Sequence, residues 1–292
     1  MKILPTARFG ADVADVDLRR LSAADADALK AAVYEHQLLR FDGVDLTDAE
    51  YVALAKKLGT PQRYFQHHYH HPEHAEIFVS NNVPFAGNQR VGVAATGRMW
   101  HVDYQFFPEP LPLTFVMPKI VPDGGRGTLF VDMVDALRRL PAALQPLIGA
   151  RCRQDAVLYY KVQPSDVDKG IGELMEEFHR TAPGAVHPAV VTHPVNGRRA
   201  LFVSSGFTQR VEGMPHAASH QLLQATFDWL ERECEAHLAP WQAGRLLLWD
   251  NRQVMHRSSG TLHSGPSRSY RIGVYDGLPF YPGLPVTGEV QP

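Results

Sequence analysis

Short apolar segments recur along this chain, and glycine, proline, asparagine or aspartate bounds most of them. Such runs of about four to eight residues between turn signals are typical of β-strands. The regular alternation of strand and helix that marks a parallel sheet is missing. We therefore predict a mainly β fold, a jelly-roll barrel with flanking helices on its outside. The predicted strands cover 9–18, 37–41, 76–80, 113–117, 128–131, 189–193, 200–203, 245–249 and 269–275.

Helices are predicted where a capping residue precedes an apolar stripe. Ser22, Thr47 and Asp132 each occupy such a capping position. Polar residues dominate 163–184, although 171–180 could form one helix. The clearest helix covers about 219–237, and its predicted buried stripe consists of Leu223, Phe227, Leu230 and Cys234. Cys234 is therefore expected in the core.

The composition narrows the range of partners. Lys and Arg number 29 against 31 Asp and Glu, a formal net charge of -2, which argues against a nucleic-acid or polybasic membrane surface. No apolar run approaches the roughly 18 residues of a membrane helix, and the N-terminus has no signal-peptide pattern. Cys152 and Cys234 are expected to be reduced thiols. We expect one cytoplasmic domain over 1–292 with a small-molecule partner.

A His-x-Asp pair lies in the stretch 97–104. Side chains two apart in an extended strand project to the same side, so His101 and Asp103 could bind one metal ion together. A third ligand must come from elsewhere, and His256 follows a strand-like run and a polar turn. Two imidazoles and one carboxylate form the facial triad of non-haem Fe(II) oxygenases, which leaves positions open for a co-substrate and dioxygen. We therefore predict iron at these three residues.

Two further residues suit a 2-oxo acid co-substrate. Arg271 supplies a planar two-pronged donor for a carboxylate, and Thr128 supplies a hydroxyl. In the strand 269–275, Arg271 shares one face with Ser269, Gly273 and Tyr275, while the other face is apolar and aromatic. The strand is therefore predicted to have a core face and a pocket face. The loop 81–97 leads into the His-x-Asp stretch and is placed to cover the metal.

Other uses of these residues stay open. Zinc hydrolysis also employs two histidines and one carboxylate, but a helical His-Glu-x-x-His pair is absent and no obvious general-base glutamate neighbours the ligands. Five of the fifteen histidines lie in 67–74. This tract is either a polar loop or the metal-capturing element of a non-catalytic, cupin-like binding protein.

In combination, these motifs resemble the TauD/TfdA family of Fe(II)- and 2-oxoglutarate-dependent dioxygenases. The resemblance implies a double-stranded β-helix of the cupin-like barrel type, Fe(II) held by His101, Asp103 and His256, 2-oxoglutarate held by Thr128 and Arg271, and O2 as oxidant. Sulfonate-cleaving members carry a second arginine where this chain has Tyr275, so an alkylsulfonate substrate is not expected. The resemblance covers nearly the whole chain, through Phe9-Gly10-Ala11, Trp100-His101-Val102-Asp103, Gly127-Thr128, Trp249-Asp250-Asn251-Arg252, His256 and Arg271.

A narrower set of residues resembles the isonitrile synthases of this superfamily, enzymes of secondary metabolism. These enzymes oxidise an N-carboxymethyl β-amino acid, lose its carboxymethyl carboxylate as CO2 and leave an isocyano group. The resemblance implies an amino-acid-like substrate held by Tyr64, Tyr69, Tyr104, Arg126, Lys161 and Tyr275. The matching segments are Tyr64, Tyr69-His70-His71, 76–80, His101-Val102-Asp103-Tyr104, Pro108-Glu109-Pro110, Arg126-Gly127-Thr128, Lys161, Pro164-Ser165-Asp166-Val167 and Tyr270-Arg271.

Two positions depart from the isonitrile branch. Phe65 stands where the branch has the second tyrosine of a pair, and Gly260 stands where it has a histidine, with His263 nearby in the sequence. A hydroxylase or desaturase that acts on a related small carboxylate is therefore the alternative. The sequence also leaves open a homo-oligomer and delivery of the substrate by an acyl carrier protein.

Overall fold

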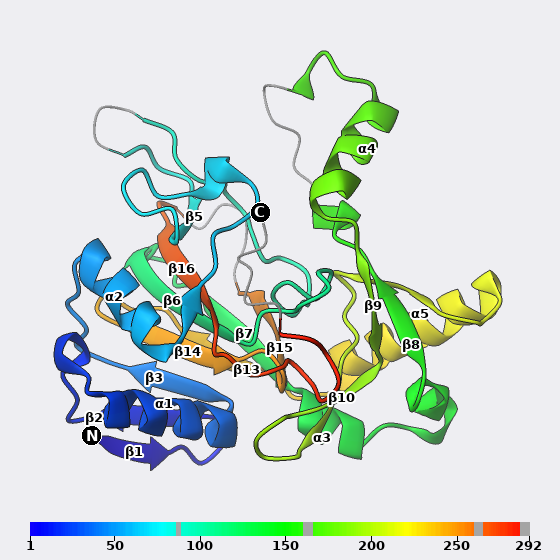
Figure 1. Cartoon of the computed structure of the whole chain (residues 1–292), viewed down its shortest axis with the longest axis horizontal. Coiled ribbons are helices and arrows are strands. Elements are labelled where there is room, and N and C mark those ends of the chain that lie inside the picture. Colours follow the sequence, from blue (N-terminus) through cyan, green and yellow to red (C-terminus); the bar gives the residue numbers. More distant parts are fainter. Residues whose placement is uncertain (86–88, 160–165, 260–264, 287–292) are drawn as a thin grey trace.

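The computed structural model describes residues 1–85, 89–159, 166–259 and 265–286, and two packed sheets form its centre (Figure 1). The smaller sheet has the order β13 (His237–Pro240), β7 (Gly127–Asp132) and β15 (Val254–Ser258). The larger sheet runs β1 (Lys2–Pro5), β2 (Ala11–Ala14), β3 (Leu38–Phe41), β14 (Leu246–Asp250), β6 (Leu113–Ile120), β16 (Arg268–Tyr275) and β4 (Thr60–Pro61), and β5 (Phe78–Asn81) also pairs with β16. This arrangement confirms the predicted jelly roll.

Apolar side chains from both sheets meet between them. Phe130 of the smaller sheet packs with Val116 and Trp249 of the larger one. The outer face of the larger sheet is covered by α1 (Ala23–His36) and α2 (Asp48–Leu58). Ile272 and Val274 of β16 are buried beneath these helices, which confirms the predicted core face of that strand.

The remaining elements flank the smaller sheet. A second apolar cluster joins Val131 and Met255 of that sheet to Leu223 and Leu230 of α5. The flanking elements are α3 (Met133–Arg138), α4 (Ile171–Thr181), α5 (His216–Glu233), a sheet of β12 (Thr208–Val211), β8 (Arg151–Gln154) and β9 (Ala185–Pro188), and the hairpin of β10 (Val190–Thr192) and β11 (Arg199–Leu201). Figure 1 shows α4 extending away from the barrel.

The predicted helix starts are confirmed. Ser22 and Thr47 both form capping boxes, and Asp132 accepts backbone hydrogen bonds at the start of α3. The strand predicted over 9–18 is shorter, because Asp15 turns the chain with a φ of 55°. The helix predicted over 219–237 begins at His216 and ends at Glu233, because the chain becomes extended at Cys234 and then enters β13.

Both cysteines are free thiols that pack with apolar side chains. Burial raises the pKa of Cys152 to about 12 and that of Cys234 to about 11, so neither favours the reactive thiolate. Cys152 is a core residue, whereas Cys234, which was expected in the core, is only partly buried and packs against its edge. Within the described ranges, no helix has the length and apolar character needed to cross a bilayer. The single domain over 1–292 stays a prediction.

A buried ion pair joins the turn before β15 to the chain after β16. Arg252 Nη1 lies 2.7 Å from Asp276 Oδ2, and Nη2 lies 3.0 Å from Oδ1. The Tyr34 hydroxyl donates to the same carboxylate at 2.7 Å, and Arg252 Nε donates to the Phe280 carbonyl at 3.1 Å. Burial acts to raise the pKa of Asp276, but the hydrogen bonds and charge of Arg252 outweigh it and hold that pKa below its ordinary range.

Candidate metal and co-substrate site

Two distant segments meet at the centre of the site. The His101 amide donates to the His256 carbonyl at 3.0 Å, and the His256 amide donates back to the His101 carbonyl at 2.9 Å. His256 lies in β15, whereas His101 forms only an isolated bridge to that strand. The backbone itself therefore places the two imidazoles side by side.

The strand predicted around His101 is wrong, because the chain turns immediately after the bridge. The Gln105 amide donates to the Val102 carbonyl at 3.2 Å, and the Phe107 amide donates to the Tyr104 carbonyl at 2.9 Å. Tyr104 has a φ of 56°, which no extended strand contains. Asp103 therefore lies in a turn that follows the bridge at His101, and not in a continuous strand.

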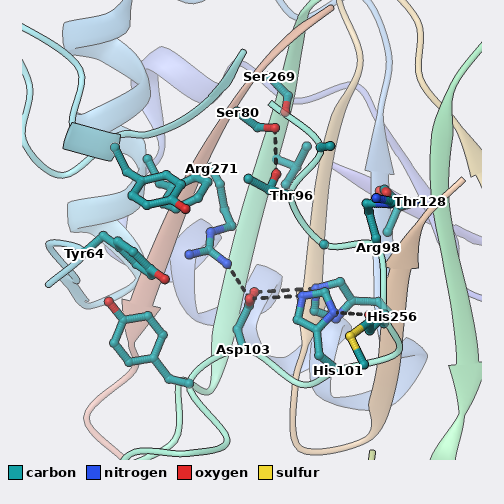
Figure 2. Close-up of a pocket in the computed structure, with 18 of the residues that line it drawn as sticks. Tyr64, Ser80, Thr96, Arg98, His101, Asp103, Thr128, His256, Ser269 and Arg271 are labelled. Atoms are coloured by element: carbon teal, nitrogen blue, oxygen red, sulfur yellow. Dashed lines mark hydrogen bonds and ion pairs between the residues drawn. The ribbon is translucent and has the colours of Figure 1, made fainter. Parts of the chain in front are cut away.

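The three predicted metal ligands converge (Figure 2). His101 Nε2 lies 3.8 Å from Asp103 Oδ1, and His256 Nε2 lies 3.7 Å from Asp103 Oδ2. All three residues are buried, and one potential ligand atom from each lies within 4.8 Å of the others. These residues could therefore hold one metal ion. They form the only such group of three in the part of the chain that the structure describes.

The electrostatics of the group match what a metal requires. Burial lowers the pKa of His101, and burial together with the neighbouring imidazole lowers the pKa of His256 well below the ordinary value. Burial acts to raise the pKa of Asp103, but Arg271 and the two histidines outweigh it and the pKa is lowered. Two neutral imidazoles beside a carboxylate are the protonation states in which these side chains bind a divalent metal.

The orientation of His101 also fits a metal ligand. Its Nδ1 lies 2.7 Å from the Met99 carbonyl, an arrangement that places the proton on Nδ1 and turns the Nε2 lone pair toward Asp103. His256 Nδ1 is buried with no hydrogen-bond partner among the described residues. Two imidazoles and one carboxylate are nevertheless the donors of the Fe(II) site that the sequence predicted, and the His101 ring is held in the orientation of a ligand.

Arg271 is directed into the site from β16. Its Nη1 donates to Asp103 Oδ1, and its guanidinium lies 4.4 Å from the centre of the Phe78 ring and 5.8 Å from that of Tyr64. Ser269 lines the same cavity, as the predicted pocket face requires. Further along that face, the side chain of Leu111 packs against Gly273, where an added Cβ would lie 2.2 Å from Leu111 Cδ2.

A cavity of about 480 Å³ opens beside the three predicted ligands. Aromatic side chains contribute to its walls, among them Phe78, Phe106, Phe207, Trp241 and Trp249. Segment 95–99 forms part of the rim, which agrees with the expectation that the loop leading to His101 covers the site. The sequence-predicted residues on the wall are Tyr64, Tyr69, Tyr104, Arg126, Thr128 and Arg271.

The predicted substrate contact at Tyr275 does not agree with the structure. Its hydroxyl donates to the Glu109 carbonyl at 3.2 Å, and its ring packs in an aromatic cluster with Phe107, so Tyr275 is not part of the cavity wall. Leu111 packs on Gly273, which lies between Arg271 and Tyr275 on that face, and none of Leu111, Gly273 and Tyr275 is on the cavity wall. Lys161, Gly260 and His263 lie outside the described residues.

Thr128 of β7 and Arg126, which immediately precedes that strand, both line the cavity. Trp241 Nε1 donates to Thr128 Oγ1 at 3.0 Å, which leaves the threonine proton available for a ligand in the cavity. Arg126 Nη1 donates to Ser267 Oγ at 2.9 Å, and its guanidinium lies 4.7 Å from the centre of the Trp241 ring. Burial lowers the pKa of Arg126.

The histidine tract 67–74 is divided among separate contacts. His70 Nε2 lies 2.6 Å from the Tyr64 carbonyl, and His71 Nε2 lies 3.3 Å from Asp48 Oδ2. No member of the tract belongs to the metal-ligand group found among the described residues. The tract therefore shows no metal-capturing geometry.

Sequence reasoning missed Arg98 and Thr114. Arg98 is an exposed residue on the rim of the cavity (Figure 2). Thr114 is fully buried and donates to Asp103. A lone hydroxyl within the apolar run 113–117 was the signal that could have revealed Thr114, because a buried hydroxyl needs a hydrogen-bond partner.

Comparison with known proteins identifies the family. Residues 2–273 match the family model described as Taurine catabolism dioxygenase TauD, TfdA family. The chain belongs to the TauD/TfdA family. It is an Fe(II)- and 2-oxoglutarate-dependent dioxygenase, an oxidoreductase that consumes O2. Membership contradicts both the zinc-hydrolase and the non-catalytic alternatives.

Relatives within the TauD/TfdA family align over most of the chain. An (S)-phenoxypropionate/alpha-ketoglutarate-dioxygenase of Delftia acidovorans is 28% identical over 88% of this chain and 89% of that protein. An alpha-ketoglutarate-dependent 2,4-dichlorophenoxyacetate dioxygenase of Cupriavidus pinatubonensis is 28% identical over 85% of this chain and 88% of that protein. The fold resembles that of AAD-2, solved in complex with Mn(II) and N-oxalylglycine, with a TM-score of 0.76, 24% identity and coverage of 96% of this chain and 100% of that one.

Proposed function

We propose that His101, Asp103 and His256 bind the Fe(II) of this dioxygenase and that Arg271 and Thr128 bind 2-oxoglutarate. The observation that carries this proposal is the convergence of two neutral imidazoles and one carboxylate within 4.8 Å, beside an arginine directed into the same cavity. When bound, Fe(II) couples oxidative decarboxylation of 2-oxoglutarate to the oxidation of a substrate C–H bond. The chain itself orients the two small molecules and keeps water from the reacting atoms.

Arg271→Leu is expected to raise the KM for 2-oxoglutarate about 100-fold, because two charge-assisted hydrogen bonds to a carboxylate are lost. Arg271→Lys should recover only part of the affinity, since an ammonium lacks the planar fork. The measurement is succinate formation as a function of 2-oxoglutarate concentration. Arg268→Leu is the matched control on the same strand, because Arg268 contacts Asn81 and Phe85 outside the cavity. A KM for Arg271→Leu equal to that of Arg268→Leu would contradict the assignment.

For the substrate, we propose a small carboxylate. Arg98 and Arg126 line the cavity in addition to Arg271, and Asp103 is the only acidic residue on the described wall. This excess of positive charge favours an anionic substrate over a cationic one. The hydroxyls of Tyr64, Tyr69 and Tyr104 would serve as neutral hydrogen-bond donors, since burial raises their pKa values, that of Tyr69 to about 12.

The specific reaction we propose is the conversion of an N-carboxymethyl β-amino acid to an isonitrile. The resemblance of the residues around Tyr64, Tyr69 and Arg126 to isonitrile synthases supports it, and these residues line the cavity. Loss of the carboxymethyl carboxylate as CO2 with formation of the isocyano group removes four electrons from the substrate. One molecule of 2-oxoglutarate together with one O2 removes two electrons from the substrate. Two succinates therefore form for each isonitrile.

A second candidate is hydroxylation of an aryloxyalkanoate. Two relatives are named for phenoxypropionate and dichlorophenoxyacetate, and the aromatic rings of Phe78, Phe106 and Phe207 would pack against a substrate ring. This reaction forms one succinate for each product. A homo-oligomer, an acyl carrier protein and a cytoplasmic location stay predictions from the sequence.

The succinate-to-product ratio discriminates the two candidates. The enzyme is reconstituted anaerobically with Fe(II) and 2-oxoglutarate, exposed to O2 with N-carboxymethyl β-amino acids or with aryloxyalkanoates, and analysed by mass spectrometry. We expect an isonitrile with two succinates. A hydroxylated or desaturated product with one succinate would reject isonitrile formation and retain the dioxygenase. Absence of substrate-dependent succinate from every carboxylate tested would contradict the proposed substrate class.

A further inference from the structure

The carboxylate of Asp103 is held by the chain from two sides. Thr114 Oγ1 donates to Asp103 Oδ2 at 2.7 Å, while Arg271 donates to Oδ1. Asp103 is 2% exposed and Thr114 is completely buried. Water therefore has little access to replace the threonine hydroxyl, and the position of the carboxylate depends on the groups around it.

The direction of the Thr114 hydrogen bond is fixed by its neighbours. Asn251 Nδ2 donates to Thr114 Oγ1 at 2.9 Å, so the hydroxyl accepts there and has its single proton left for Asp103. The Asn251 carbonyl oxygen accepts from Trp249 Nε1 at 2.9 Å. An indole nitrogen can only donate, which orients the amide of Asn251 and, through it, the hydroxyl of Thr114.

Strand pairing brings these groups together. Thr114 in β6 is the register partner of Trp249 in β14, and the backbone amide of Asn251 donates to the Pro112 carbonyl at 2.8 Å. Asn251 is 1% exposed, and its Oδ1 also lies 3.4 Å from the Asp103 amide. The rigid centre of the larger sheet thus supports both the backbone and the carboxylate of Asp103.

We propose that Thr114 and Asn251 are positioning residues that hold the Asp103 carboxylate in the orientation required for metal binding. The inference rests on the proposed function of Asp103 as a ligand of the iron. Neither residue is one of the three proposed ligands His101, Asp103 and His256. They act by orienting Asp103, as residues that hydrogen-bond to a metal ligand commonly do.

Thr114→Val tests the proposal because it keeps the shape of the side chain and removes the hydroxyl. The measurements are the dissociation constant of Co(II), used as an air-stable probe, and its visible absorption spectrum. We expect Thr114→Val to weaken Co(II) binding about 10- to 100-fold and to change the spectrum. Thr114→Ser, which retains the hydroxyl, should restore both. Asn251→Ala should weaken binding in the same direction by a smaller factor, and it replaces Thr114→Val as the test if that variant fails to fold.

Two further variants separate the possible failures. Thr226→Val removes another fully buried hydroxyl, which bonds to the Leu222 carbonyl in α5, and should leave Co(II) binding unchanged. Asp103→Ala should abolish tight binding. Suppose that Thr114→Val or Asn251→Ala binds Co(II) with the affinity and spectrum of Thr226→Val, while Asp103→Ala loses binding. That result would overturn the positioning role but keep Asp103 as a ligand. Wild-type affinity in Asp103→Ala would instead overturn the assignment of the ligand.

Discussion

His101→Ala is expected to abolish substrate-dependent succinate formation and to lose bound iron. Loss of a hydrogen-bond partner behind a metal ligand costs about 10- to 100-fold in affinity or activity, and the loss of a ligand itself should exceed that. His101 is buried against His256 and Asp103, so water has little access to the space that the imidazole leaves. The measurements are iron content after anaerobic reconstitution and succinate formation with 2-oxoglutarate in excess.

Two controls show whether the effect belongs to the metal. His187→Ala removes another buried imidazole, one that contacts the Phe107 carbonyl and the Tyr281 hydroxyl outside the cavity, and it should retain iron even if it is less stable. His67→Ala removes an exposed histidine of the 67–74 tract and should change neither measurement. Full succinate formation by His101→Ala, or loss of iron from His67→Ala, would refute the proposed iron site.

Arg252→Leu is expected to lower the free energy of unfolding by about 3–5 kcal/mol, the usual consequence of leaving a buried charge without its partner. Asp276 would keep the Tyr34 hydroxyl but lose both guanidinium hydrogen bonds. The double variant Arg252→Leu with Asp276→Leu should recover much of the loss, because apolar side chains often replace a buried ion pair at little cost. Urea unfolding measures both effects.

The loss of stability in Arg252→Leu should depend on pH, because Asp276 is titratable. In the wild type the lowered pKa of Asp276 contributes stability above the ordinary carboxyl pKa of about 3.9, and this contribution is lost as the pH falls through the native value. In Arg252→Leu the guanidinium no longer opposes the effect of burial, so the pKa of Asp276 rises. Protonation of Asp276 in mild acid then removes the cost of burying an unpaired carboxylate. The stability difference between the two proteins should therefore be smaller at pH 4 than at pH 7.

A partly exposed ion pair is the control for this prediction. Arg245→Leu breaks the pair with Asp42, whose side chain is 63% exposed, and should cost no more than about 1 kcal/mol. Equal losses for Arg245→Leu and Arg252→Leu would contradict the view that burial makes the Arg252 pair important.

Features set by neighbouring residues could be predicted from the sequence. The caps at Ser22 and Thr47 depend on a hydroxyl and a carboxylate three residues apart, and both form as expected. The two faces of β16 follow from side-chain alternation, which correctly places Arg271 at the cavity and Ile272 in the core. The alternative of a helix over 171–180 is also confirmed, by α4.

Features set by distant contacts could not be predicted in the same way. Side-chain alternation predicted a pocket face that continues to Tyr275, but the sequence does not reveal that Leu111 packs on Gly273 before that residue is reached. His101 pairs with His256, a residue about 150 positions away in the sequence, and a turn follows at once, so neighbouring residues did not reveal that the strand ends there. The role of Thr114 likewise depends on Asn251, which follows a neighbouring strand.

The reciprocal backbone hydrogen bonds between His101 and His256 make this barrel a scaffold for exchanging metal ligands. A replacement other than proline at either position can keep the same pair of main-chain bonds, since those bonds do not involve the imidazoles. A thiolate or a second carboxylate introduced there would start from the same Cα positions as the proposed histidine ligands. Metal preference, which follows the hardness and charge of the donors, can therefore be redesigned at this site without rebuilding the loop that carries Asp103.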